Sequence, residues 1–226
     1  MNKVWEGGVG VRERHERERM ATSRAILDAA RDLFVAEGYQ NVSIRKIAEK
    51  IEYSPAAIYS YFPSKDDIFL ALAEEGFHML FASASADCAK VPAADASRVD
   101  CVRSAFWNLY TFSKNHPEYF ALMFVDRSVP RISQDWQRFG FVREMRHRLS
   151  DIIQQAIDAG DFPRTSDPNG IFRVLSAAIH GVAVIRLCDR ILPGEDIDAL
   201  ARDTLEAALT GLRSGFASTY SSDGCR

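Results

Sequence analysis

The stretch SIRKIAEKIEYSPAAIYSYFPSK, residues 43–65, decides the fold, because its pattern predicts two short helices joined by a tight turn. The first predicted helix begins after Ser43, a residue type that caps helix N-termini well. Its apolar residues follow the i, i+3, i+4, i+7 spacing of a single helix face. They are Ile44, Ile47, Ala48 and Ile51.

The second helix is predicted over residues 55–62, between two prolines. Ser54 can cap it, and Pro55 would occupy the first helical position, where the missing N–H is not needed. Pro63 ends it, and Ser64 can cap a third helix. Isolated helices of this length are marginal in water, so this one must pack on its neighbour through Ile58 and Phe62.

The side of the second helix that is left exposed carries hydroxyl groups. Its residues are Ala57, Tyr59, Ser60 and Tyr61, with Ser54 and Lys65 flanking them. Hydroxyls and a cation on a short projecting helix suit the major groove of DNA and its phosphates. The alternative is an ordinary helical corner of an all-α core.

A longer segment around this stretch, residues 23–69, resembles the N-terminal DNA-binding domain of TetR-family transcriptional regulators. The resemblance rests on three motifs in order: F-x-x-x-G-Y at 34–39, a Ser-capped helix containing Ile-Ala, and I-Y-x-Y-F-x-S-K-D at 58–66. It implies a helix-turn-helix DNA-binding domain over residues 21–67. It also implies a larger helical effector-binding and dimerisation domain over residues 68–215.

The family pattern also implies which residues contact DNA. Ala56, Ala57 and Ser60 would face the groove, where an alanine reads only a thymine methyl group or permits close approach. We expect the hydroxyls of Tyr59 and Tyr61 to reach phosphates or base edges. The complete predicted set is Ser43, Ser54, Ala56, Ala57, Tyr59, Ser60, Tyr61 and Lys65.

Two positions depart from the family pattern. Glu52 occupies the turn position where the family often has glycine, so a left-handed conformation there would cost about 1–2 kcal/mol, or the turn differs. Ala57 stands where many relatives carry threonine, which removes one hydroxyl from the predicted phosphate contacts.

The rest of the chain has a helical pattern, so we expect an all-α protein. After a helix that begins at Ser64 and ends near residue 87, the sequence predicts helices at about 95–115, 117–127, 134–159, 167–190 and 196–214. The segments NHPEYFALMF at 115–124 and IHGVAVIRL at 179–187 resemble a C-terminal subgroup of the same family with HPE-aromatic and H-G motifs. These motifs name no ligand.

An aromatic concentration between residues 106 and 124 is the candidate effector pocket. Ligand pockets are mostly apolar and aromatic with a few placed polar groups, although such stripes also form ordinary cores. In a family that senses small molecules we expect an apolar or aromatic effector, with Tyr110, His180 and Arg186 orienting it. The candidate pocket residues are Phe106, Trp107, Tyr110, Phe120, Met123, Phe124, His180 and Arg186.

The last two predicted helices carry faces of small and apolar residues, which suit close helix packing across a dimer interface. Packing of both faces within one subunit is the alternative. A homodimer would place two reading heads one DNA turn apart on a palindromic operator. The candidate interface residues are Val174, Ala178, Gly181, Ile185, Leu200, Thr204, Ala207, Ala208 and Gly211.

Charge and hydropathy limit the alternatives. Formal net charge is −3, with +2 in residues 1–65 and −5 in the remainder, so the slight basic excess lies with the predicted reading head. No apolar run reaches about 18 residues, which predicts no membrane span. The N-terminus has no apolar core of the secretory type, and we expect a cytoplasmic protein.

The two ends of the chain are predicted to be irregular: residues 1–20 as a flexible segment and 216–226 as a disordered tail. RERHERER at 12–19 is expected to begin the first helix, with i,i+4 pairs such as Glu13 with Arg17. The alternative is an N-terminal arm in which Arg12, Arg14 and Arg17 reach the minor groove of DNA.

Enzymatic and metal-binding signatures are lacking in the sequence. The five histidines are scattered singly, the four cysteines follow no metal-ligand spacing, and Cys188 is expected to be a small buried hydrophobe. We therefore expect no enzyme, no metal and no cofactor. The predicted function is a ligand-responsive DNA-binding regulator, a repressor released by its effector. The alternatives are a helical protein-binding adaptor and, more remotely, a catalytic helical bundle.

Overall fold

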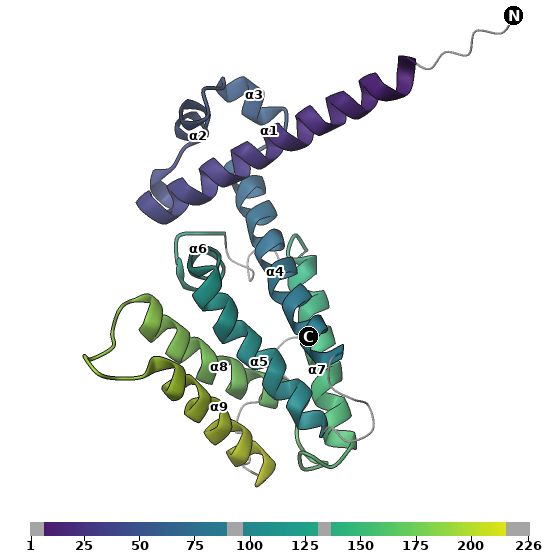
Figure 1. The fold of residues 1–226 in the computed structure, drawn as a ribbon, viewed down its shortest axis with the longest axis vertical. Coiled ribbons are helices and arrows are strands. Elements are labelled where there is room, and N and C mark those ends of the chain that lie inside the picture. The colour runs from purple at the N-terminus through teal and green to yellow at the C-terminus, as the bar shows by residue number, and fades with distance from the viewer. Residues whose placement is uncertain (1–6, 90–96, 131–136, 216–226) are drawn as a thin grey trace, which may run out of the picture.

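The computed structural model describes residues 7–89, 97–130 and 137–215. These residues form helices, turns and bends, and no strand occurs among them, so the predicted all-α fold is confirmed. The chain has two parts, one above the other in Figure 1, and a long helix passes from one into the other.

The N-terminal part is built from the segment that opened the sequence analysis. Its elements are α1 (Gly7–Glu37), the short 3-10 helix η1 (Tyr39–Asn41), α2 (Ile44–Lys50), α3 (Pro55–Tyr59) and the beginning of α4 (Lys65–Ala89). The apolar faces of α1, α2 and α4 meet in a small core that α3 enters only through Ile58. The core residues with no exposed surface include Ile26, Ala30, Ile47, Ala48, Ile58 and Ile68.

Side chains and glycine conformation set the helix ends that the sequence predicted. Ser43 caps α2 by accepting a hydrogen bond from the Lys46 N–H at 3.3 Å, and Ser54 caps α3 by accepting from the Ala57 N–H at 3.1 Å. Gly38 follows α1 with φ of +81°, a conformation that glycine adopts at little cost. The helix α3 is shorter than predicted: it ends at Tyr59, whereas the sequence predicted residues 55–62.

Glu52, in the turn between α2 and α3, has φ of +58°. This is the left-handed conformation that the sequence comparison anticipated at that position. The family's usual glycine would adopt it without strain, whereas a residue with a Cβ atom costs about 1–2 kcal/mol. The turn therefore keeps its family geometry in spite of the substitution.

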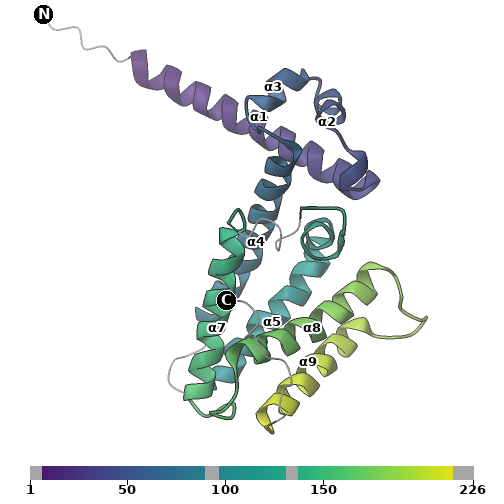
Figure 2. The ribbon, with the colours of Figure 1, turned by 180° about the vertical axis from the view of Figure 1, so that it is seen from behind.

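The C-terminal part is a bundle around α5 (Arg98–Asn115). After it come α6 (Pro117–Phe120), the π-helix η2 (Ala121–Val125), α7 (Gly140–Asp158), α8 (Pro168–Leu187) and α9 (Ile197–Arg213). The helix α5 contacts α4, α7, α8 and α9. Figure 2 shows α8 and α9 side by side, with α9 at the edge of the bundle, while α8 also contacts α7.

The π-helix η2 is one wide turn inserted after α6. The Asp126 N–H donates to the Ala121 carbonyl at 2.8 Å, five residues back rather than four. Single π-turns of this kind are rare and often accompany functional sites. The residues of η2 lie where α6 meets α4, between the two parts of the protein (Figure 1).

Two sequence-based expectations need correction, and a third feature concerns helix α8. Residues 7–20, expected to be flexible, continue α1 as regular helix; the expected segments 1–6 and 216–226 lie outside the described residues. Cys188 is exposed rather than buried, because it is the C-cap residue of α8, beyond the packed turns. The helix α8 is long and apolar enough to cross a membrane, with mean hydropathy 1.6, but it is a helix of the bundle.

Candidate DNA-binding surface and effector cavity

The exposed surface of α3 and its turn carries most of the predicted DNA contacts. Ser43, Ser54, Ala56, Tyr59 and Ser60 are exposed, and more than half of Tyr59 is open to solvent. The Ser60 hydroxyl donates to the Ala57 carbonyl at 2.7 Å, which holds it at the end of α3. Ser54, Ala56, Tyr59 and Ser60 thus lie together on α3 and its caps, whereas Ser43 lies at the N-terminus of α2.

Two residues of the predicted set, Ala57 and Tyr61, are half-buried. Tyr61 lies beside α1, where the Arg19 guanidinium is 5.9 Å from its ring centroid. The Tyr61 side chain also lines a shallow groove between α1 and α3, together with His15 and Tyr53. Its ring packs toward α1, so the free Tyr59 ring is better placed than Tyr61 to enter a groove.

Lys65, expected to meet phosphate as a free charge, is held by the protein itself. Its ammonium group donates to the carbonyls of Tyr39 at 2.9 Å and Val42 at 3.0 Å, and lies 4.1 Å from the Tyr39 ring centroid. Burial lowers the Lys65 pKa, and the Asp66 carboxylate partly opposes this. Lys65 therefore ties the first turn of α4 to the segment between α1 and α2.

Tyr39 makes contacts with both Lys65 and Asp66 at the start of α4. Its ring packs against Phe34 and Phe69, with centroids at 5.1 and 5.7 Å, and its hydroxyl donates to Asp66. Burial, reinforced by that carboxylate, raises the Tyr39 pKa well above its usual range. The tyrosine of the F-x-x-x-G-Y motif thus has a structural task.

Two further residues belong to the candidate DNA surface but were not predicted. Arg45 lies in the first turn of α2 beside Ser43, with 81% of its side chain exposed and an ion pair to Glu49 at 2.8 Å. Tyr53 is an exposed aromatic in the turn before α3. A basic residue directly after a helix cap was the available signal for Arg45, whereas nothing in the pattern distinguished Tyr53 from a turn residue.

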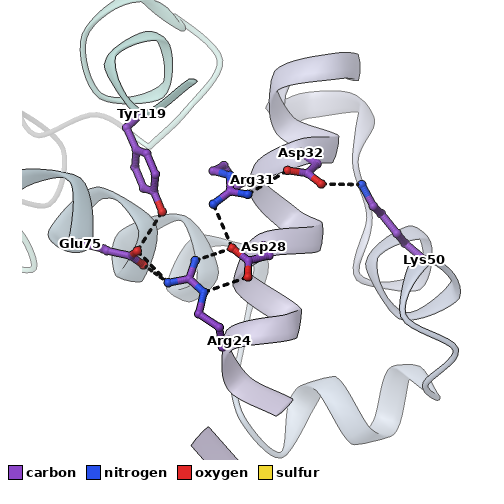
Figure 3. A network of polar contacts seen from close by, with 7 residues as sticks. All are labelled: Arg24, Asp28, Arg31, Asp32, Lys50, Glu75 and Tyr119. Atoms are coloured by element: carbon purple, nitrogen blue, oxygen red, sulfur yellow. Dashed lines mark hydrogen bonds and ion pairs between the residues drawn. The ribbon is translucent and has the colours of Figure 1, made fainter. Parts of the chain in front are cut away.

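A continuous chain of polar contacts connects the two parts of the protein (Figure 3). It begins on α2, crosses α1 and α4, and ends on α6. Its members are Lys50, Asp32, Arg31, Asp28, Arg24, Glu75 and Tyr119.

Arg24 is the centre of this chain. Its guanidinium bonds Asp28 on the same helix at 2.7 and 3.0 Å, and both carboxylate oxygens of Glu75 on α4 at 2.7 Å. Glu75 also accepts from the Tyr119 hydroxyl of α6 at 3.0 Å. The bond from Arg24 holds the pKa of Asp28 below its ordinary value. A displacement of α6 would therefore reach α1 through Glu75.

The contact between α4 and α6 is close because α4 has a glycine there. A Cβ atom at Gly76 would lie 2.4 Å from the Met123 sulfur and 3.0 Å from the Tyr119 ring. Both distances are shorter than ordinary contacts, so a side chain at position 76 would require Met123 and Tyr119 to shift. The residues that form the polar chain and those that line the cavity therefore meet at one place on α4.

An apolar cavity of about 290 Å³ lies between α4, α5, η2, α7 and α8. Ligand pockets range from about 300 to 1,000 Å³, so this one is small. Among the residues that the structure describes, no acidic side chain lines the cavity. It consists of Phe77, Leu80, Phe81, Ala105, Phe106, Leu109, Met123, Phe124, Val142, Met145, Arg146, Leu149, Phe172, Arg173, Ser176 and His180.

The structure places four of the eight predicted pocket residues in this lining: Phe106, Met123, Phe124 and His180. His180 stands between aromatic rings, with the Phe124 and Phe120 centroids at 4.8 and 5.8 Å. Its Nδ1 is 2.7 Å from the Ser176 carbonyl, so the neutral ring donates there and leaves Nε2 as an acceptor. Burial lowers the pKa of His180 despite that hydrogen bond.

The other four predicted pocket residues lie outside the lining, which corrects their assignment. Tyr110 is fully buried toward α9, where its hydroxyl donates to Asp198 at 2.6 Å. Trp107 is on the same side, near Arg202. Arg186 donates to the Ser113 carbonyl, and Phe120 is a core residue behind His180. These side chains leave their helices on faces turned away from the cavity.

The nine predicted dimer residues all lie on α8 and α9, and none of them is buried. Leu200 is 45% exposed and Ile185 38%. A Cβ atom at Gly181 or Gly211 would meet nothing within 4 Å. The small-residue face is therefore partly exposed in the single chain, although Val174 and Ala208 also pack against its core.

No group of three or more histidine, cysteine or acidic side chains among the described residues is arranged to hold a metal ion.

Comparison with known proteins gives a family match over the N-terminal part. Residues 26–72 match the model of the family described as bacterial regulatory proteins, tetR family. The chain is 26% identical to the uncharacterized HTH-type transcriptional regulator YdeS of Bacillus subtilis, over 85% of this chain and 90% of that protein. It is 40% identical to the HTH-type transcriptional repressor Rv1474c of Mycobacterium tuberculosis, over 29% of this chain and 35% of the repressor.

The fold is also similar to that of a solved structure, the transcriptional regulator FadR from Bacillus subtilis in complex with stearoyl-CoA. The TM-score is 0.70 at 17% identity, over 83% of this chain and 98% of that one. At this identity the similarity extends to the arrangement of helices and not to the side chains of the site.

Proposed function

The chain belongs to the TetR family of bacterial regulatory proteins, and on that premise we propose that it is a dimeric repressor released from DNA by a small-molecule effector. One observation carries this proposal. A capped helix-turn-helix corner and an apolar cavity lie in different parts of the chain, and a single helix, α4, belongs to both.

We propose that α3 enters the major groove with Tyr59 at its exposed end. Ser54, Ala56 and Ser60 would lie against the groove walls, and Ser43 with Arg45 would meet the phosphates beside α2. The three cations of α2 are each paired, Arg45 with Glu49, Lys46 with Glu37 and Lys50 with Asp32. Phosphates would therefore have to replace carboxylates as their partners, most readily at exposed Arg45.

We propose that a second copy of this chain covers the exposed face of α8 and α9. The supporting fact is that α8 is strongly apolar while only 39% of its most apolar stretch is buried. A two-fold axis at this face would pair α8 and α9 with their copies and hide Ile185 and Leu200. Two reading heads would then face a palindromic double-stranded operator.

The effector would act through α4. A molecule in the cavity would press on Met123 and Phe124 of η2, which contacts α4 at Gly76. Movement of α6 would pass from Tyr119 to Glu75 and Arg24, and so turn α1 with its reading head. Because binding energies are reciprocal, effector and operator must weaken each other's binding. We propose no catalytic activity, no cofactor and no metal, and a place in the cytoplasm with the DNA.

The test measures binding of the full chain to duplexes from the DNA flanking its own gene. Fluorescence anisotropy monitors this binding at several salt concentrations. A regulator binds one duplex in preference to scrambled DNA, and its affinity falls steeply with salt. The Tyr59→Ala variant should lose preference for that duplex while keeping the helical circular dichroism of the unaltered chain. If no flanking duplex is preferred at any salt concentration, the proposal fails and a helical protein-binding adaptor remains.

A further inference from the structure

We propose that the effector is a single-chain amphiphile with an anionic head group, held with its head at Arg146 and Arg173 and its chain along the cavity. This inference deepens the proposed function and rests on it, since it identifies the cavity as the effector site. It names a chemical class and not a particular compound.

The first step is the cationic end of the cavity. Arg146 on α7 and Arg173 on α8 both line it, and their guanidinium carbons lie 5.9 and 5.7 Å from the centroid of Phe172. The Arg146 Nη2 donates to the Asn169 side-chain oxygen at 3.1 Å, a neutral acceptor. Within the part of the chain that the structure describes, neither arginine has a carboxylate partner within 4 Å, and no acidic residue lines the cavity.

The second step is a comparison along α7. Arg148, two residues from Arg146, points away from the cavity and is paired with Glu144. The charge of Arg148 is thus balanced by a carboxylate. The charges of the two arginines that line the cavity are not balanced by any carboxylate among the described residues. Charge-assisted hydrogen bonds from guanidinium to carboxylate or phosphate are the strong kind and are often bidentate, so an anion is the ligand group that this end lacks.

The third step is the opposite end. His180 lies seven residues after Arg173 on α8, which places it about 10 Å farther along the helix axis. Aromatic and thioether side chains surround it, and the Phe124 ring centroid is 4.8 Å from that of His180. Because burial keeps the His180 ring neutral, a second anion would find no charge there. An apolar chain fits this end.

The lining between the two ends is apolar throughout one side. Leu80, Leu109 and Leu149 contribute from α4, α5 and α7, together with Phe106 of α5. A flat aromatic acid would fill one end only. A chain that starts at the arginines and ends near Phe124 would reach η2, which is the part of the lining in contact with α4.

The test is isothermal titration calorimetry of the full chain with decanoate, decanoyl-CoA, 1-decanol and benzoate. We expect at least one of the two decyl anions to bind about tenfold or more tightly than 1-decanol, because the alcohol lacks the charge. Preference for decanoate would identify a free carboxylate as the head, and preference for decanoyl-CoA its phosphates. Equal binding of 1-decanol, tighter binding of benzoate, or no binding of either decyl anion would overturn the inference.

Variants separate the head from the chain. The double variant Arg146→Ala/Arg173→Ala should weaken the preferred anion about tenfold or more and leave 1-decanol unchanged. Arg148→Ala removes a cation from the same helix outside the cavity and should change neither affinity. Ala105→Phe, which fills the cavity and keeps both arginines, should weaken the anion and 1-decanol alike. An unchanged anion affinity in the double variant contradicts the inference, and circular dichroism checks that each variant is folded.

Measurement of DNA binding on the same samples distinguishes failure of this inference from failure of the proposed regulatory function. If a decyl anion binds as expected but operator affinity stays constant, the ligand class stands and effector-controlled release fails. If operator binding is intact and no decyl anion binds, the ligand class fails and DNA binding stands.

Discussion

Arg24 of α1 donates to both carboxylate oxygens of Glu75 of α4, each at 2.7 Å, and so joins the reading head to a helix that lines the cavity. Glu75 also receives the Tyr119 hydroxyl of α6 at 3.0 Å. A single carboxylate thus fixes the relative positions of three helices from two parts of the chain. Its charge is needed to hold the guanidinium, whereas its shape is not.

The Glu75→Gln variant tests that joint. It keeps the size of the side chain but removes the charge, so the free energy of unfolding should fall by about 1 kcal/mol, as for a partly exposed ion pair. In the proposed dimer, affinity for a palindromic duplex should fall several-fold, because the two heads would lose their fixed spacing, while affinity for a half-site duplex stays the same. Urea denaturation and fluorescence anisotropy provide the two readouts.

The matched control is Glu144→Gln on α7, which breaks the exposed pair with Arg148. It should change neither quantity measurably. Equal losses on palindrome and half-site in Glu75→Gln would mean that Glu75 supports the head itself and not its spacing.

The strained turn predicts a stabilising substitution. Glu52→Gly should raise the free energy of unfolding by about 0.5–1 kcal/mol, since relief of about 1–2 kcal/mol of left-handed strain exceeds the greater freedom of glycine in the unfolded chain. Asp189, with φ of +51°, gives a comparison: Asp189→Gly should gain less, because aspartate tolerates this conformation better. Thermal unfolding measures both. A lower melting temperature for Glu52→Gly would show that the glutamate side chain has a stabilising contact that outweighs the strain.

Lys65 and Arg45 should behave in opposite ways. Lys65→Met removes the donor to the Val42 carbonyl and one of the two donors to the Tyr39 carbonyl, and should lower the free energy of unfolding by about 2 kcal/mol. Arg45→Ala touches an exposed pair and should change stability by no more than about 0.5 kcal/mol. It should instead weaken all duplexes alike and reduce the slope of log affinity against log salt by about one. Titration with urea and with salt separates the two, and a reduced salt slope in Lys65→Met at full stability would restore its phosphate role.

Asp198 makes stability depend on acid. Hydrogen bonds from Lys114 and Tyr110, both at 2.6 Å, lower its pKa, so the folded state favours the carboxylate. Its stabilisation is therefore present above the ordinary aspartate pKa of about 3.9 and is lost as pH falls through the lower folded value. The pair with Lys114 is more than a third exposed, so we expect only about 1 kcal/mol at neutral pH.

The measurement for Asp198 compares urea unfolding at about pH 7 and about pH 3, below the ordinary aspartate pKa. Asp198→Asn should be less stable than the unaltered chain at neutral pH and nearly equal to it in acid. Asp203→Asn on the same helix, an exposed side chain, is the control and should follow the unaltered chain at both pH values. A difference for Asp198→Asn that persists in acid would mean that its cost is one of packing and not of charge.

The sequence was sufficient for the features that depend on neighbouring residues. Ser43, Ser54 and Pro55 set helix ends by local hydrogen bonds and ring geometry, so their positions followed from residue type. For Glu52 a left-handed conformation or a different turn was expected, because the family often has glycine at that position, and the structure has the left-handed conformation. The same local logic explains why the helices of the C-terminal part lie close to the predicted ranges.

The site was less predictable because it depends on which helix faces which. Periodicity shows that Phe106 and Tyr110 share a face of α5, yet Phe106 lines the cavity while Tyr110 turns toward Asp198 of α9. Arg146 and Arg173 were missed because exposed-looking arginines on amphipathic helices usually contact solvent. The expectation of a free charge at Lys65 was wrong because its ammonium group donates to two carbonyls between α1 and α2, more than twenty residues earlier in the sequence.

The wide turn of η2 has a consequence for how such proteins diversify. Each residue of an α-helix turns the chain by about 100°, so loss of one residue from 121–125 would restore regular winding and change the directions of the side chains within this turn. Met123 and Phe124 would then leave the cavity wall, although no residue in contact with the ligand had been substituted. Ligand preference can therefore change by a single-codon deletion here, a route that comparison of aligned positions would overlook.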